Sequence, residues 1–191
     1  MSMDRFDAFW VETRATPACS DCGFSASSIS AEDAVAALRA GPERWRSALT
    51  VDLGDGQAEA LLEARPPGGW SALEHAGYVR DVLHALDIRI QRLLREDCPV
   101  LPGTHVSPPA GANEQGMAVV LAAQGVSDDH LARTIETTAA SAWSRPGLRA
   151  GRRVTALDLL REAVHADEHH LRQAKEAIAW ARATPAASAH P

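Results

Sequence analysis

The sequence predicts an all-α protein, a four-helix bundle with a crossover connection and an irregular N-terminal segment. Hydrophobic residues make up 46% of the 191 residues and aromatic residues only 5%, which favours helices rich in alanine and leucine over sheets. Four stretches repeat their apolar residues with a helical period, and segments rich in proline and glycine separate them. Helices joined in this way are typical of a bundle with a crossover.

The chain divides into three parts in this interpretation. Residues 1–29 are expected to be irregular and to carry a Cys-x-x-Cys pair, the bundle spans residues 30–183, and the tail over 184–191 is expected to be disordered. The first helix follows Ser30, which with an aspartate three residues on forms a helix cap. A glycine followed by Pro42 is expected to bend or briefly interrupt this helix.

Three further helices follow. The second is predicted from Ser71 to about Glu96, because Ser71 and a glutamate three residues on form a capping box before a long amphipathic run. A short apolar helical run is expected over 117–124, and a separate third helix opens at Ser127. The fourth, Thr155–Ala181, contains no proline or glycine and is predicted to be one uninterrupted helix.

Two connections differ in character. Residues 97–116 form a long segment rich in proline and glycine, and loops of that length in a compact domain are usually functional or mobile. We therefore treat Asn113 as a candidate substrate-binding residue, with a plain solvated loop as the alternative. Residues 144–153 are expected to form a basic turn that leads into the fourth helix.

The charge and hydropathy of the chain exclude some partners. The net charge is −6 and the arginines alternate with acidic residues, so the sequence offers no basic stripe for nucleic acid. No window approaches the ~20 apolar residues of a membrane span, and the N-terminus lacks the apolar core of a signal peptide. We expect a cytoplasmic protein that acts on small molecules, and homodimer formation is left open.

The fourth helix carries the pattern of a metal site. His165 and His169 are four residues apart, so their side chains emerge on one face of the helix, close enough to bind a single ion. His170 is about 100° further round and is expected to face elsewhere. If the second helix packs alongside, His75 could supply a third imidazole. The alternative is that these histidines are solvated or lie at the edge of the core.

The N-terminal segment contains a second candidate site. Cys19 and Cys22 have the spacing with which zinc ribbons begin, but a closed structural zinc site needs four ligands and no second Cys-x-x-Cys exists. Histidines from elsewhere could complete it. The alternatives are a tight turn with two ordinary thiols, or a redox pair.

Several motifs together resemble the DinB/YfiT-like superfamily. They are the Cys-Ser-Asp-Cys-Gly-Phe run at Cys19–Phe24, the Arg-Trp-Arg at Arg44–Arg46, the second-helix entry at Trp70–Leu83, and the His-x3-His-His run ending at His170. More narrowly, the chain is similar to the actinobacterial branch that includes the N-terminal domain of mycothiol-dependent maleylpyruvate isomerase and related thiol transferases. The resemblance covers nearly the whole chain.

The resemblance implies a divalent metal, zinc or nickel, bound by one ligand from the second helix and two from the fourth. The fourth-helix ligands would be His165 and His169. In such proteins the second-helix ligand usually stands where this sequence has Tyr78, which is a departure. His75, one turn earlier, could substitute, Tyr78 could ligate weakly or hydrogen-bond a bound water, or the site could be degenerate and hold no metal.

The function that the resemblance implies is a metal-dependent transferase or isomerase that uses a low-molecular-weight thiol such as mycothiol. Tyr78 and Arg80 are candidates for binding its substrate, although Arg80 could instead form an ion pair with Asp81 or Glu74. The alternative is a non-catalytic bundle that binds metal or a small ligand at a degenerate site, recognisable by the Tyr78 ring filling that space. A third possibility is metal-dependent hydrolysis, which would need a carboxylate base near the ion.

The carboxylates closest in sequence to the histidines could orient the imidazoles from behind. They are Glu74 on the second helix and Glu162, Asp167 and Glu168 on the fourth. The alternative for each is an ordinary surface acid.

Overall fold

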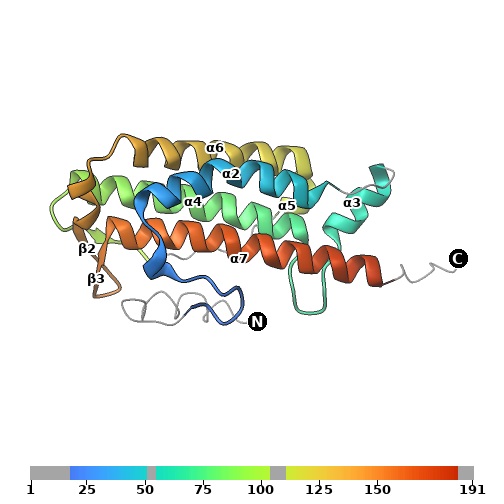
Figure 1. Ribbon diagram of the computed structural model, residues 1–191. Coiled ribbons are helices and arrows are strands. Elements are labelled where there is room, and N and C mark those ends of the chain that lie inside the picture. The colour runs from blue at the N-terminus through green and yellow to red at the C-terminus, as the bar shows by residue number, and fades with distance from the viewer. Residues whose placement is uncertain (1–17, 51–54, 104–110, 185–191) are drawn as a thin grey trace, which may run out of the picture.

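Four long helices run side by side along the molecule (Figure 1). The computed structural model describes residues 18–50, 55–103 and 111–184. The long helices are α2 (Ala31–Leu49), α4 (Ala72–Arg95), α6 (Met117–Glu136) and α7 (Ala156–Ala183). The shorter helical elements are η1 (Ala26–Ser28), α3 (Asp55–Glu63), α5 (Ala112–Gln115) and η2 (Ala140–Ser144). The predicted all-α bundle is therefore confirmed, and none of the described helices is both long and apolar enough to cross a bilayer.

The helix starts lie where their capping residues predict them. In α2, α4 and α7 the N-cap hydroxyl accepts a hydrogen bond from the backbone N–H three residues on, and the acid at that position accepts one from the N-cap backbone. The N-cap residues are Ser30, Ser71 and Thr155. Losing such a cap typically costs about 1 kcal/mol of stability.

At two places where the sequence suggests an interruption, the helix is continuous. α2 continues through Pro42, and α6 is one helix from Met117 to Glu136 rather than a short run followed by a second helix. Gly125, where the break was expected, lies beside α2: a Cβ atom placed there would be 3.9 Å from the Pro42 side chain. A glycine inside a helix costs about 1 kcal/mol of stability but does not end the helix.

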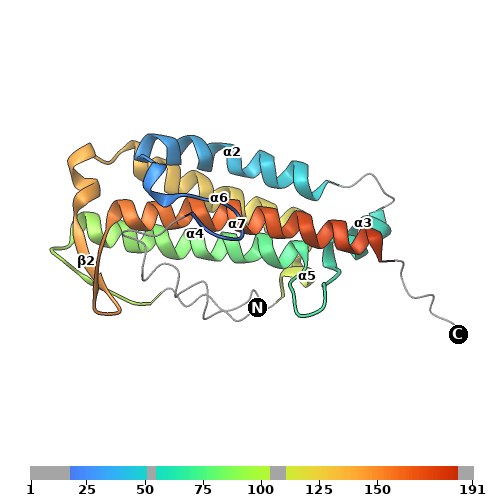
Figure 2. The same cartoon turned by 60° about the horizontal axis from the view of Figure 1, so that its bottom comes forward.

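The sequence interpretation missed a small sheet at one end of the bundle (Figures 1 and 2). Its order is β1-β2-β3, with β1 (Val100–Leu101) parallel to β2 (Pro146–Arg149) and β2 antiparallel to β3 (Arg152–Thr155). The expected basic turn is thus a β-hairpin, which turns at Ala150 and Gly151 with positive φ. The strands are too short to show the alternating pattern by which strands are recognised.

Helix α7 lies between the other elements, and this arrangement positions the candidate site. It packs against α4 and α2, and the described part of the N-terminal segment runs beside it in both views (Figures 1 and 2). The Phe24 ring stacks on the His165 ring, and Arg172 donates a hydrogen bond to the Asp21 backbone carbonyl. As a result α7 is buried at nearly every position over 162–171.

Candidate metal site

The two cysteines lie in a tight turn that presents both thiols to α7. The Gly23 N–H donates to the Cys19 carbonyl at 2.7 Å, and the Cys19 N–H donates to the Phe24 carbonyl at 2.8 Å. Gly23 closes this turn with φ of 75°, a conformation that favours glycine. Cys19 is buried, and Cys22 is partly buried.

Four potential metal ligands meet where this turn contacts α7. One ligand atom from each of Cys19, Cys22, His165 and His169 can be chosen so that all four lie within 4.8 Å of one another. The Cys19 Sγ is 3.8 Å from the His169 Nδ1. Ligand atoms on a tetrahedral zinc ion are about 3.3 to 3.8 Å apart, since Zn–S bonds are about 2.3 Å and Zn–N bonds about 2.0 Å long. Two thiols and two imidazoles are a ligand set that zinc accepts, and the more distant atom pairs would have to move closer to bind one ion.

The protonation states of these histidines favour binding of a metal cation over binding of a proton. Burial lowers the pKa of His165 to about 3 and lowers that of His169, so both imidazoles are neutral at neutral pH, the form that binds metal. Burial raises the pKa of the Cys22 thiol to about 11. A divalent ion would reverse that effect, because its charge stabilises the thiolate.

His75, the predicted third imidazole, is not a member of this group among the described residues. Its Nδ1 lies 2.9 Å from the Nδ1 of His170, so one ring donates a hydrogen bond to the other. His170 faces α4 because it is about 100° round the helix from His169, as the sequence predicts. Burial lowers the pKa of His75 to about 4 and that of His170 well below its usual value, so this pair is uncharged at neutral pH.

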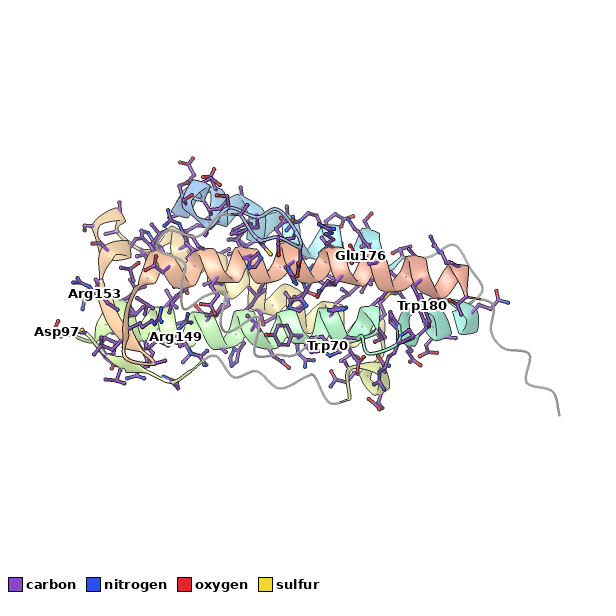
Figure 3. All side chains as sticks on the ribbon, turned by 90° about the horizontal axis from the view of Figure 1, so that it is seen from below. Trp70, Asp97, Arg149, Arg153, Glu176 and Trp180 are labelled. Carbon is purple, nitrogen blue, oxygen red and sulfur yellow. The ribbon has the colours of Figure 1, made fainter. Side chains whose placement is uncertain are left out.

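Tyr78 fills the space beside His170. Its side chain is 6% exposed, and its ring centroid is 4.5 Å from that of His170 and 5.1 Å from that of Trp70. Trp70, just before the start of α4 (Figure 3), contacts rings of both α4 and α7 and stacks on His170 with ring centroids 5.8 Å apart. The rings therefore pack on one another, the arrangement that the sequence analysis associates with a degenerate second-helix ligand position.

The other two candidates for substrate binding have partners within the protein. Arg80 forms an ion pair with Asp81, the alternative considered for it, and also donates to the Gln115 side chain at 2.8 Å. Asn113 accepts a hydrogen bond from the Ser71 hydroxyl at 2.7 Å and donates to the Glu63 carbonyl. Both side chains tie short segments to α4.

Three of the four neighbouring carboxylates are buried rather than ordinary surface acids. Glu74 accepts from Arg65 and from the Ser71 backbone, and Glu162 pairs with Arg149 at 2.7 Å. Asp167 accepts a hydrogen bond from the Trp45 indole at 2.6 Å and pairs with Arg44. The fourth, Glu168, is partly exposed and also pairs with Arg44. Each of the four carboxylates thus has an arginine partner.

His170 was predicted to face away from the metal pair, but its partners on α4 were not predicted. The His-His dipeptide was the available signal, because adjacent residues on a helix covered from two sides contact two different neighbours. The link between the cysteine turn and α7 spans more than 140 residues, and only the possibility that histidines complete the Cys-x-x-Cys pair anticipated it.

Comparison with known proteins adds information about the fold. No protein-family model and no curated protein sequence matches the chain. Among solved structures it is similar to YfiT from Bacillus subtilis, described as a probable metal-dependent hydrolase with an unusual four-helix bundle topology. The TM-score is 0.67 at 18% identity, and the match covers 78% of this chain and 88% of YfiT. The likeness confirms a YfiT-like bundle, and the relation to mycothiol-dependent proteins stays a prediction.

Proposed function

We propose that this chain is a metal-dependent enzyme whose divalent ion, zinc foremost, is bound by Cys19, Cys22, His165 and His169. The observation that carries the proposal is the meeting of these four donors within 4.8 Å, from a turn and a helix far apart in sequence. The fold shared with YfiT, itself described as a probable metal-dependent hydrolase, supports the enzyme class.

We further propose thiol-dependent transfer or isomerisation as the reaction, with a low-molecular-weight thiol as co-substrate. A bound divalent ion would stabilise a thiolate near neutral pH. Cys19, His165 and His169 are buried, whereas Cys22, in the same turn as Cys19, is only partly buried. Cys22 is therefore the ligand that an incoming thiol would replace.

A second candidate is a bundle that binds metal without catalysis. Two observations favour it: the four donors form a complete set, as in structural zinc sites, and the Tyr78 ring packs into the space beside His170. Hydrolysis at the same ion is the remaining enzymatic alternative, which the description of YfiT supports.

Metal content tests the ligand set. Elemental analysis of the purified full-length protein should find about one zinc per chain, and close to none after His165→Ala combined with His169→Ala. The matched control is His84→Ala with Cys98→Ser, which changes an exposed histidine and an exposed cysteine and should leave the content unchanged. Equal metal content in both double variants would remove the proposal.

Cobalt substitution separates the two candidates. In the cobalt-loaded Cys22→Ser variant, titration with a small thiol should restore the sulfur-to-cobalt absorption that the substitution weakens. The thiol should also bind the wild type, with lower affinity because Cys22 competes. A spectrum that no thiol alters in either protein supports the non-catalytic candidate.

A further inference from the structure

A second polar cluster lies between α2, α6 and α7, away from the cysteine turn. On α6, Gln124 and Asp128 are one turn apart and both are 0% exposed. Both oxygens of Asp128 and both polar atoms of Gln124 are buried with no hydrogen-bond partner among the residues that the structure describes. The two side chains share a helix face yet do not bond each other.

Helix α2 supplies the opposite wall of this cluster. The Arg44 Nε is also buried without a hydrogen-bond partner, although the two terminal nitrogens of Arg44 pair with Asp167 and Glu168. A Cβ atom placed on Gly41 would be 3.3 Å from both Asp128 oxygens, so this carboxyl group lies against the α2 backbone. Pro42 has no N–H, which denies the Leu38 carbonyl its usual helical donor at the same level.

Burying these polar atoms without partners costs stability unless a bound molecule or ion forms hydrogen bonds with them. A buried polar group without a partner costs about 1–3 kcal/mol, and here several lie together. A site of this kind in a native protein calls for a bound water or ion. Burial raises the pKa of Asp128 to about 8, with repulsion from Asp167 adding to the shift and Arg44 opposing it, so the carboxyl group is neutral at pH 7.

The unpartnered atoms identify the ligand. Arg44 Nε and the Gln124 amide nitrogen are donors and would repel a cation, while Asp128 and the Gln124 oxygen can accept. Water both donates and accepts, and a protein of this size ordinarily holds several buried waters, about one per 27 residues. Each such water typically makes about three hydrogen bonds.

We propose that α2, α6 and α7 enclose an internal water site in which one or two ordered waters bridge Asp128, Gln124 and Arg44. The waters link α2 to α6 at the level where Pro42 interrupts the hydrogen-bond ladder of α2. A Cβ atom at Gly41 would crowd the Asp128 oxygens, and one at Gly125 would touch Pro42, so α2 and α6 lie close together at this level.

A crystal structure of the full-length protein grown with rubidium chloride tests the ligand directly. We expect density for water within hydrogen-bonding distance of an Asp128 oxygen and the Gln124 amide, with no anomalous signal from rubidium. Direct hydrogen bonds between the side chains, an empty space, or a rubidium peak would each overturn the proposal.

Two substitutions at one position provide a second test. Asp128→Asn keeps polar atoms for the water, so the water density should persist and the Tm at pH 7 should not fall. Asp128→Leu removes them and leaves Gln124 and Arg44 unsatisfied, which should lower the Tm by about 2 to 10 °C. A leucine variant as stable as the asparagine variant would contradict a water-bridged cluster. If the leucine variant does not fold, the density in the wild type and the asparagine variant decides.

Discussion

Neighbouring histidines on α7 have opposite surroundings. His169 faces two thiols and a second imidazole, all of them atoms that bind metal. His170, the next residue, faces Trp70, His75 and Tyr78, whose rings pack against it. The spacing of histidines on a helix determines which face of the helix each one occupies. Whether that face becomes part of a metal site depends on the segment that packs against it.

The two segments that cover α7, the cysteine turn and α4, differ in how readily a metal ligand beside them could be replaced. The cysteine turn is partly exposed, at Asp21 and Gly23, and contacts α7 through the Phe24 stack and the hydrogen bond from Arg172. The α4 side is part of the bundle core, where Tyr78 and Val79 are buried. A ligand could therefore be exchanged on the cysteine side at less cost than on the α4 side.

The largest effect should come from removing metal. Chelation should lower the free energy of unfolding of the wild type by several kcal/mol, since a ligand that binds only the native state at 1,000 times its Kd adds about 4 kcal/mol. Differential scanning calorimetry with and without chelator would measure this. The His165→Ala and His169→Ala double variant should show no response, and a response equal to that of the wild type would place the stabilising ion elsewhere.

The second effect concerns Asp128 on α6, in the polar cluster between α2, α6 and α7. The folded pKa of Asp128, about 8, exceeds the unfolded value of 3.8, so the native state keeps a proton that the unfolded state releases between these values. The contribution of this group to stability therefore falls by about 1.4 kcal/mol per pH unit as pH rises from about 4 to about 8, and then levels off. The charged groups facing it are Arg44 on α2 and Asp167 on α7.

The Asp128→Asn variant should lack this contribution. Its stability relative to the wild type should rise by about 4 kcal/mol between pH 5 and pH 8, measured by urea unfolding. Asp129→Asn is the matched control, because this neighbour forms partly exposed ion pairs with Arg39 and Arg133 and should shift the curve by less than about 1 kcal/mol. Parallel curves for Asp128→Asn and the wild type would mean that Asp128 is charged in the native state.

The contrast between the cysteine side and the α4 side of α7 also shows which features of the fold and the site could be predicted from the sequence. Helix starts at Ser30, Ser71 and Thr155 follow from local hydrogen bonds, and the four-residue spacing of His165 and His169 follows from helix geometry; both are properties of adjacent residues. The partners of these histidines depend on which distant segment covers each face. The same limit hides the parallel pairing of β2 with residues near position 100, whereas the hairpin after 144 was missed because its strands are too short to show alternation.

The smallest expected effect tests whether the His75–His170 pair is separate from the four clustered metal ligands. His75→Phe should leave the metal content near one ion per chain, because the His75 ring contacts His170 and is not among the four clustered ligands. Stability should fall by about 1–3 kcal/mol, since the buried Nδ1 of His170 loses this hydrogen bond. Tyr78→Phe is the matched control and should also retain metal. If His75→Phe loses metal as completely as the His165→Ala and His169→Ala double variant, the ion is bound by three histidines from two helices, as the sequence alone suggested, and the distinction between the sides of α7 fails.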